Sequence, residues 1–215
     1  MNNEMIIEVN EVYKKYDDAT VLDNVSLEIE KGKIYGLVGR NGSGKTVLMK
    51  CICGLIKPTS GEVKVAGKTV GKDVDIPEDI GVIIETPGFI PNYSGFKNLK
   101  LLASVRNKIS NEEIRKSMEI VGLEPKSRKH VGKYSLGMRQ KLGIAQAIME
   151  KPKILILDEP MNGLDNESVA VVRKILKEQA ENGATIILAS HNREDIDVLC
   201  DKVYTMDHGV IECER

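Results

Sequence analysis

The sequence lacks the features that would place it in a membrane or outside the cell. Among its 215 residues, no apolar run approaches the roughly 20 residues needed to span a bilayer. The first four residues, Met-Asn-Asn-Glu, have no signal-peptide character. We therefore expect a cytoplasmic protein that reaches a membrane only through a partner.

Neither sign of charge is in excess. The chain has 31 lysines and arginines against 32 aspartates and glutamates, which gives a net charge of −1. A protein that binds the nucleic-acid backbone usually carries a basic surplus, so we predict no nucleic-acid partner. The sequence shows no repeat, low-complexity tract or linker, and its length suffices for one good-sized core with a small subdomain.

The sequence has only four cysteines, and they do not suggest a disulfide framework. Cys51 and Cys53 lie in one apolar stretch, whereas Cys200 and Cys213 are isolated near the end of the sequence. A metal site at Cys51 and Cys53 would need further ligands nearby, and none are visible. We expect reduced thiols that pack as small apolar side chains in a reducing cytosol.

The most specific pattern in the chain is Gly-Arg-Asn-Gly-Ser-Gly-Lys-Thr at residues 39–46, which has the G-x-x-x-x-G-K-[ST] spacing. An apolar run precedes it and an apolar-periodic stretch follows, so it lies between a predicted strand and a predicted helix. The glycines let backbone N–H groups cradle phosphates, and a helix beginning near Gly44 points its positive end at them. Lys45 offers a charge to the β and γ phosphates, and Thr46 offers a hydroxyl to Mg²⁺.

A second group of polar residues follows two later apolar strands. Asp158 ends the run 153–158 and Glu159 follows it, and ligands of open α/β sheets bind at such strand ends. Asp158 can hold Mg²⁺, and Glu159 can orient or deprotonate an attacking water. His191 follows the next apolar strand, so its position favours a contact with the γ-phosphate.

The pattern along the chain predicts an α/β fold. Alternating segments at 5–9 and 21–29 predict two strands that pair antiparallel on one flank of the fold. The near-continuous apolar run at 153–158 predicts a parallel strand that is covered on both faces. Further strands are predicted at 62–65, 80–84 and 184–190, and a hairpin is predicted at 202–206 with 210–213.

The middle of the chain changes to helical periodicity from Ser94 to Met149. A capping box at 110–113 opens one helix, and Ser135 or Leu136 opens another. An amphipathic helix is also predicted at 167–181, and a short helix at 193–199. The helical stretch therefore interrupts two sheet-forming parts of one domain.

In this order the motifs resemble those of the nucleotide-binding subunit of an ABC transporter, and the resemblance covers nearly the whole chain. The segment Tyr-Ser-Leu-Gly-Met-Arg-Gln at 134–140 lies where the family has its signature, usually Leu-Ser-Gly-Gly-Gln. The resemblance implies a P-loop NTPase over residues 1–215, with a mainly parallel sheet core and an antiparallel β flank. It places the core at about residues 1–85 and 150–215, and the helical signature subdomain at about 86–149.

The resemblance also assigns the site residues. ATP would be bound by Tyr16, stacked on adenine, and by Gly39, Arg40, Asn41, Gly42, Ser43, Gly44, Lys45, Thr46 and Val47. Glu159 and His191 would be catalytic, and Thr46, Glu85 and Asp158 would bind Mg²⁺. A second subunit's ATP would be bound by the signature residues Ser135, Leu136, Gly137 and Met138, with Asp165 on the loop that crosses the dimer interface.

Three positions depart from the usual family residues. Leu136 replaces a glycine and Met138 a glutamine, while the serine and the second glycine of the signature remain. Glu85 stands where the family normally has a glutamine that touches Mg²⁺. Its setting, Glu-Thr-Pro-Gly-Phe at 85–89, is similar to that in ATPases of bacitracin-type and lantibiotic-immunity exporters.

The resemblance implies an ATPase that binds ATP and Mg²⁺ and dimerises, as a homodimer, around two ATP molecules. It would drive a separate polytopic membrane subunit, a peptide-antibiotic or multidrug exporter, on the inner face of the cell membrane.

One alternative is a soluble ABC-type ATPase that acts on nucleic acid or ribosomes. Such proteins usually carry coiled-coil insertions, zinc modules or tandem domains, none of which is visible here. A small-molecule kinase would explain the phosphate loop but not the signature. The transported molecule, its direction and homo- against heterodimer formation stay open.

Overall fold

The computed structural model of the protein describes residues 4–214. Three of the four amino-terminal residues that lack signal-peptide character lie outside this part. The strands are β1 (Met5–Tyr16), β2 (Ala19–Glu30), β3 (Ile34–Val38), β4 (Ser60–Val65), β5 (Lys68–Thr69), β6 (Ile80–Ile83), β7 (Ile154–Asp158), β8 (Thr185–Ala189), β9 (Lys202–Asp207) and β10 (Val210–Cys213). The helices are α1 (Lys45–Ile52), α2 (Gly95–Arg106), α3 (Asn111–Ile120), α4 (Leu136–Ile148), α5 (Asn166–Glu181) and α6 (Arg193–Leu199), with a 3₁₀ turn at Val131–Lys133.

Two sheets form the framework of the fold. The larger has the strand order β10-β9-β3-β8-β7-β6, and all of its pairings are parallel except that of β9 with β10. The smaller is antiparallel, in the order β2-β1-β4-β5. The predicted parallel core, antiparallel flank and terminal hairpin are therefore confirmed.

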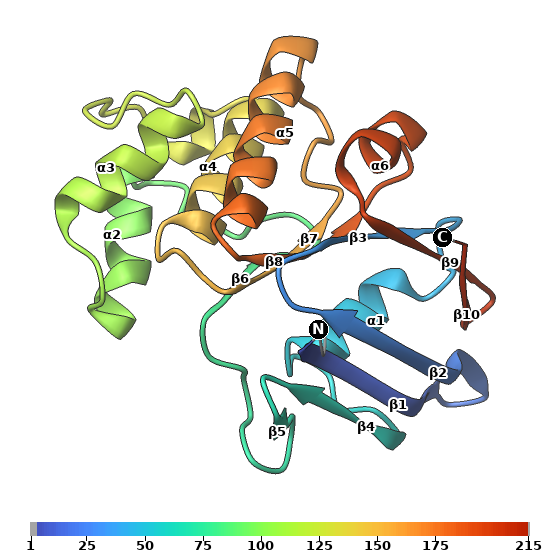
Figure 1. The fold of residues 1–215 in the computed structure, drawn as a ribbon. Coiled ribbons are helices and arrows are strands. Elements are labelled where there is room, and N and C mark those ends of the chain that lie inside the picture. Colours follow the sequence, from blue (N-terminus) through green and yellow to red (C-terminus); the bar gives the residue numbers. More distant parts are fainter. Residues whose placement is uncertain (1–3, 215) are drawn as a thin grey trace.

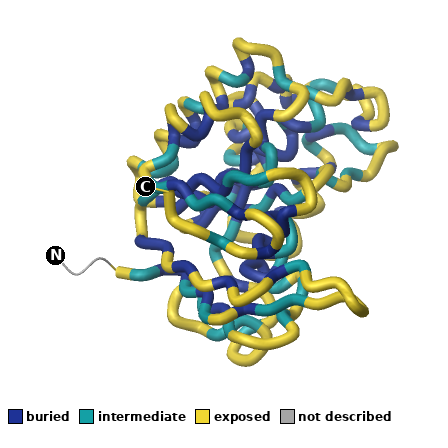
Figure 2. The backbone as a smooth tube through the Cα atoms, turned by 90° about the vertical axis from the view of Figure 1, so that its right-hand side faces the viewer, coloured by how far each residue is buried: buried dark blue, intermediate teal, exposed yellow. Residues whose placement is uncertain are grey.

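The larger sheet is covered on both faces. In Figure 1, α1 and the antiparallel sheet lie below it, α4, α5 and α6 lie above it, and α2 and α3 lie to the left. Along β7 the side chains alternate between two apolar clusters, with Leu155 and Leu157 facing the helices and Ile154 and Ile156 facing the antiparallel sheet. A strand buried in this way needs apolar side chains at every position, which explains its unbroken apolar run. Figure 2 shows these buried stretches inside a shell of exposed loops.

The helical stretch is set by local capping. Ser110 accepts from the backbone N–H of Glu113, whose carboxylate accepts from the backbone N–H of Ser110, as the capping-box pattern predicts. Ser135 caps α4 by accepting a hydrogen bond from the N–H of Met138. Both predicted helix starts are therefore confirmed.

Two further predictions concern the burial of the cysteine thiols and the lack of a membrane-spanning helix. Cys51 and Cys53 are buried in α1 and at its end, and burial raises the pKa of their thiols to about 11 and about 12. Their thiols therefore stay protonated and pack as apolar groups, as predicted. Among the described residues, no helix has both the length and the apolarity to cross a membrane.

The two sheets are tied together beside the strand that carries the phosphate loop. Glu30, at the end of β2, is 7% exposed and forms ion pairs with Lys33 and with Lys202 of β9. Its backbone N–H donates to the hydroxyl of Tyr35 in β3, at 2.9 Å. Hydrogen bonds from Lys202 and Lys33 lower the pKa of Glu30 from 4.5 to about 2. A buried carboxylate thus joins the antiparallel sheet to the parallel one.

This ion pair should make stability depend on acid pH. Because the folded-state pKa of Glu30 lies below 4.5, its contribution is complete above about pH 4.5 and is lost as the pH falls toward about 2. Glu30→Gln should therefore lower the free energy of unfolding most at neutral pH, and the gap to wild type should narrow in acid. Urea unfolding at several pH values measures this gap. Glu4→Gln, which breaks the exposed pair with Lys31, is the control. A gap that does not change with pH would contradict the prediction.

Candidate active site

The phosphate loop lies between β3 and α1, as predicted. Gly44 precedes α1 with φ of +108°, and a Cβ there would lie 2.8 Å from the carbonyl oxygen of Val21, so only glycine fits. The helix begins at Lys45, and its free backbone N–H groups therefore open onto the loop. The loop is a ready anion site because these N–H groups and the helix dipole act together.

Lys45 places its charge inside this loop. Its Nζ donates to the carbonyl oxygens of Gly39, at 2.7 Å, and Arg40, at 3.0 Å. Burial lowers the pKa of Lys45, while the nearby charges of Asp158 and Glu159 act in the opposite direction. The ammonium group is thus held by the loop carbonyls, within the electrostatic influence of two carboxylates.

Two oxygen-bearing side chains meet beside Lys45. The Oγ1 of Thr46, in the first turn of α1, donates to Oδ2 of Asp158, at the end of β7, across 2.6 Å. A hydroxyl and a carboxylate are ligands that suit Mg²⁺, which prefers hard oxygen donors. The sequence separates these residues widely, and the sheet brings them together.

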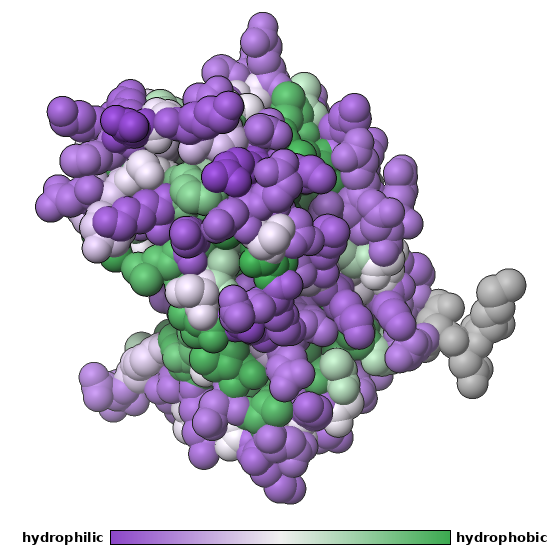
Figure 3. Space-filling view, turned by 90° about the vertical axis from the view of Figure 1, so that its left-hand side faces the viewer, coloured by the Kyte–Doolittle hydropathy of each residue, from purple (hydrophilic) through white to green (hydrophobic). Residues whose placement is uncertain are grey.

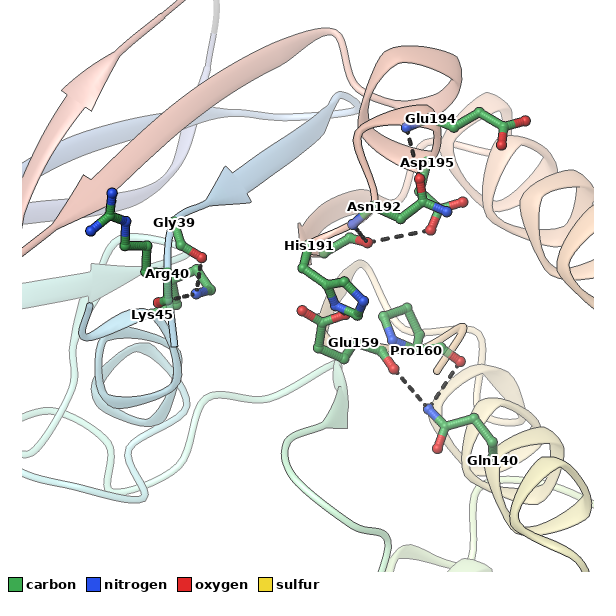
Figure 4. Close-up of polar contacts among 11 residues, drawn as sticks. Gly39, Arg40, Lys45, Gln140, Glu159, Pro160, His191, Asn192, Glu194 and Asp195 are labelled. Carbon is green, nitrogen blue, oxygen red and sulfur yellow. Dashed lines mark hydrogen bonds and ion pairs between the residues drawn. The ribbon is translucent and has the colours of Figure 1, made fainter. Parts of the chain in front are cut away.

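The residue after Asp158 has a special backbone conformation. Glu159 has φ of +50°, in the left-handed region, which is uncommon for a residue other than glycine. Its Oε2 lies 2.8 Å from Nδ1 of His191, which follows β8 (Figure 4). A carboxylate and an imidazole therefore face each other at the carboxyl ends of neighbouring strands.

A cavity of about 510 Å³ joins the phosphate loop to the carboxylates at the end of β7. It is lined by the phosphate-loop residues Asn41–Val47 and also by Glu85, Leu136, Asp158 and Glu159. The buried hydroxyl of Ser43 on this loop has no hydrogen-bond partner within residues 4–214. Such a hydroxyl suits a ligand that brings its own oxygen acceptors, as a phosphate does.

Other predicted residues lie outside this cavity. Gly39, Arg40 and His191 line a neighbouring hollow of about 440 Å³. Tyr16, at the end of β1, is partly exposed, and the Nζ of Lys14 lies 4.8 Å from the centre of its ring. The Tyr16 ring is thus accessible, at the edge of the antiparallel sheet.

The signature residues form the exposed start of α4. Ser135 and Leu136 are exposed, and Gly137 and Met138 are half-buried. Asp165 caps α5 by accepting from the N–H of Ser168, and hydrogen bonds from Ser168 lower its pKa. These residues therefore present two helix starts to solvent.

Glu85 has a partner that the sequence did not suggest. Its Oε1 lies 2.6 Å from Nζ of Lys50, in the last turn of α1, and its φ is +61°. The carboxylate thus lines the cavity while its charge is matched by a lysine from the helix that follows the phosphate loop.

The cavity also contains residues that sequence reasoning missed. These are Val21, Thr86, Pro87, Arg139, Gln140 and Asn162. Arg139 and Gln140 belong to the segment 134–140 that marks the signature, but the sequence analysis gave them no role in the site. Val21, on β2, carries no local pattern that would mark it.

Comparison with known proteins identifies the family. Residues 22–162 match the family model described as ABC transporter. The chain is 48% identical to the uncharacterized ABC transporter ATP-binding protein YybJ of Bacillus subtilis, covering 96% of this chain and 95% of the relative. It is 43% identical to the bacitracin transport ATP-binding protein BcrA of Enterococcus faecalis, and the match covers 96% of this chain and 68% of that relative. It is 36% identical to the lantibiotic transport ATP-binding protein SrtF of Streptococcus pyogenes, and the match covers 98% of this chain and 90% of that relative.

The fold has a close match among solved structures. An ATP-binding cassette solved as a dimer in a post-hydrolysis state, bound to ADP and Pi, superposes with a TM-score of 0.87. It is 22% identical and covers 98% of this chain and 99% of that one, so the likeness shows the fold.

Fold and site together define a P-loop ATPase. The chain belongs to the ABC transporter family as an ATP-binding subunit, and it is an ATPase.

Proposed function

We propose that the chain is the ATP-hydrolysing subunit of an ABC exporter that moves a peptide antibiotic or a related drug through a separate membrane subunit. The observation that supports it most is one cavity lined by the phosphate loop, the Thr46–Asp158 pair and Glu159. The transport proteins BcrA and SrtF among its relatives favour this proposal over an ATPase that works on nucleic acid or ribosomes.

The site residues divide the chemistry between them. Lys45 and the loop N–H groups hold the β and γ phosphates, with Arg40 and Val47 on either side and Tyr16 stacked on adenine. Thr46, Asp158 and Glu85 would hold Mg²⁺, which neutralises phosphate charge when bound. Glu159 accepts the proton of the attacking water, and His191 orients that carboxylate and faces the γ-phosphate.

The exposed signature supports a dimer, which we propose is a homodimer. The start of α4 is a helix N-terminus with its own serine cap, a suitable clamp for phosphate on a facing subunit. Ser135, Leu136, Gly137 and Met138 would contact the partner's ATP, and Asp165 would lie at the interface. Two subunits would then close around two ATP molecules.

The helical part offers a surface for the membrane subunit. Helix α2 exposes the apolar side chains of Leu101, Leu102 and Val105. Figure 3 views the side on which α2 and α3 lie, where apolar side chains gather in a hollow between the upper and lower parts of the face.

We infer that the protein has a peripheral position on the inner face of the cell membrane. We also infer one ABC ATPase domain over residues 1–215, with its core at about 1–85 and 150–215 and a helical subdomain at about 86–149.

The general base gives the direct test of this function. Glu159→Gln should keep ATP binding but slow steady-state hydrolysis by about 10²–10⁴-fold, because the proton acceptor is lost. Size-exclusion chromatography with Mg-ATP should then show a trapped dimer. Glu167→Gln, in the first turn of α5, is the control and should hydrolyse ATP normally. Wild-type turnover by Glu159→Gln would contradict the assignment.

The clamp between subunits can be tested by mixing variants. Ser135→Arg should spare ATP binding by the separate subunit but stop hydrolysis, because a bulky cation fills the facing site. Lys45→Ala should weaken ATP binding itself, since a charge against the phosphates is lost. A mixed dimer has one site with both changes and one intact site, so ATPase activity should return on mixing.

Exposed Ser104 on α2 supplies the matched control for added bulk, and Ser104→Arg should leave ATPase activity of the isolated subunit unchanged. Full activity of Ser135→Arg alone would show that the start of α4 does not clamp the partner's nucleotide.

The ion pair between Glu85 and Lys50 predicts how ATPase activity depends on Mg²⁺ concentration. Glu85→Gln should raise the Mg²⁺ concentration needed for half-maximal ATPase activity, because a charged oxygen ligand is replaced by an amide. ATP affinity at saturating Mg²⁺ should stay nearly unchanged. Lys50→Met should shift the Mg²⁺ requirement the opposite way, because it releases the carboxylate from its ion pair.

A Mg²⁺ titration of wild type and both variants, without any membrane subunit, measures these shifts. The same Mg²⁺ dependence in all three proteins would mean that Glu85 serves the membrane partner instead.

A further inference from the structure

Gln140 makes a contact to which the function described so far gives no role. It lies early in α4, is 8% exposed, and points its amide at the segment that follows β7 (Figure 4). Its Nε2 donates to the carbonyl oxygens of Glu159, at 3.2 Å, and Pro160, at 2.9 Å. One buried amide group therefore holds the backbone of the residue assigned as the general base.

The backbone of Glu159 needs such support. Its φ of +50° lies in the left-handed region, which is unfavourable for a residue with a Cβ and persists only where the surroundings fix it. Two backbone bonds contribute, from Glu159 N–H to the oxygen of Ala189 at 2.9 Å and from Asn162 N–H to the oxygen of Glu159 at 3.1 Å. Gln140 adds a side-chain donor to the same carbonyl and to the next. Because φ and ψ fix the direction of Cβ, these bonds also decide where the carboxylate points.

The helix that carries Gln140 begins at the signature. A Cβ on Gly137 would lie 3.0 Å from the oxygen of Gly163, so α4 packs directly on the loop that follows Glu159. Leu136 packs on the same glycine, since a Cβ on Gly163 would lie 2.6 Å from its Cδ2. The first turns of α4 therefore touch the segment from Glu159 to Gly163 at both ends.

We propose that Gln140 is a positioning residue for Glu159. Through its two hydrogen bonds, the orientation of the Glu159 carboxylate depends on the position of the signature end of α4. The inference rests on the proposed function in that it takes Glu159 as the base. A helix turn is stiff, so a displacement of the α4 start, where the partner's nucleotide would bind, moves the Glu159 and Pro160 carbonyls with it. The base in one site is then oriented by the nucleotide held in the other.

The test removes the two hydrogen bonds and asks whether the effect passes through Glu159. Gln140→Met keeps length and helix propensity but has no donor. Single-turnover hydrolysis at saturating Mg-ATP should slow by about 10- to 100-fold, because a misplaced base loses its geometry. In a Glu159→Gln background, the residual rate should be the same with and without Gln140→Met. ATP-analogue affinity should be unchanged in both backgrounds.

Two further variants make the outcome decisive. Gln146→Met changes the same residue type on the same helix without touching the bonds to Glu159 and Pro160, and should match wild type. Gln140→Glu keeps the side-chain shape and, when ionised, offers no donor, so it should reproduce the loss if Gln140→Met does not fold.

Each remaining outcome decides against a stated claim. Normal turnover of Gln140→Met while Glu159→Gln is inactive would overturn this inference alone. An equal slowing in the Glu159→Gln background would overturn it too, because Gln140 would act elsewhere. Wild-type turnover by Glu159→Gln would overturn the assignment of the base and this inference with it.

Discussion

The parallel pairing of β3, β8 and β7 is the constraint on which the rest of the structure depends. Because these strands are neighbours and run the same way, their carboxyl ends meet at one edge of the sheet. The phosphate loop leaves β3, His191 follows β8, and Asp158 ends β7. Side chains that are far apart in the sequence therefore reach one another, as the 2.6 Å bond between Thr46 and Asp158 shows.

Several charged side chains lie close together at the same edge of the sheet. The ammonium group of Lys45 donates to two loop carbonyls, and the charges of Asp158 and Glu159 act on it from nearby. Glu85, a third carboxylate lining this cavity, is matched by Lys50. The departure from the usual glutamine at position 85 is thus accompanied by a lysine that limits the added negative charge.

In the proposed dimer, residues of both chains complete each site. The signature presents its helix start to solvent, whereas the same helix holds the Glu159 backbone through Gln140 further along. One rigid element therefore belongs to two sites in the proposed dimer. This arrangement gives a physical route by which nucleotide binding on one subunit can affect chemistry on the other, without a long chain of intermediate contacts.

The sequence by itself determined the phosphate loop, the capped starts of α3 and α4 and the strand buried on both faces, because each follows from local chemistry. A glycine at positive φ, a serine cap and an unbroken apolar run act within a few residues of themselves. Family resemblance added the order of the motifs. Tertiary structure alone decided that Lys50 pairs with Glu85, that Glu30 joins two sheets, and that Gln140 holds the backbone of Glu159. These contacts join residues from different elements, and no spacing in the chain records which side chains the packing of helices on a sheet will bring within hydrogen-bond distance.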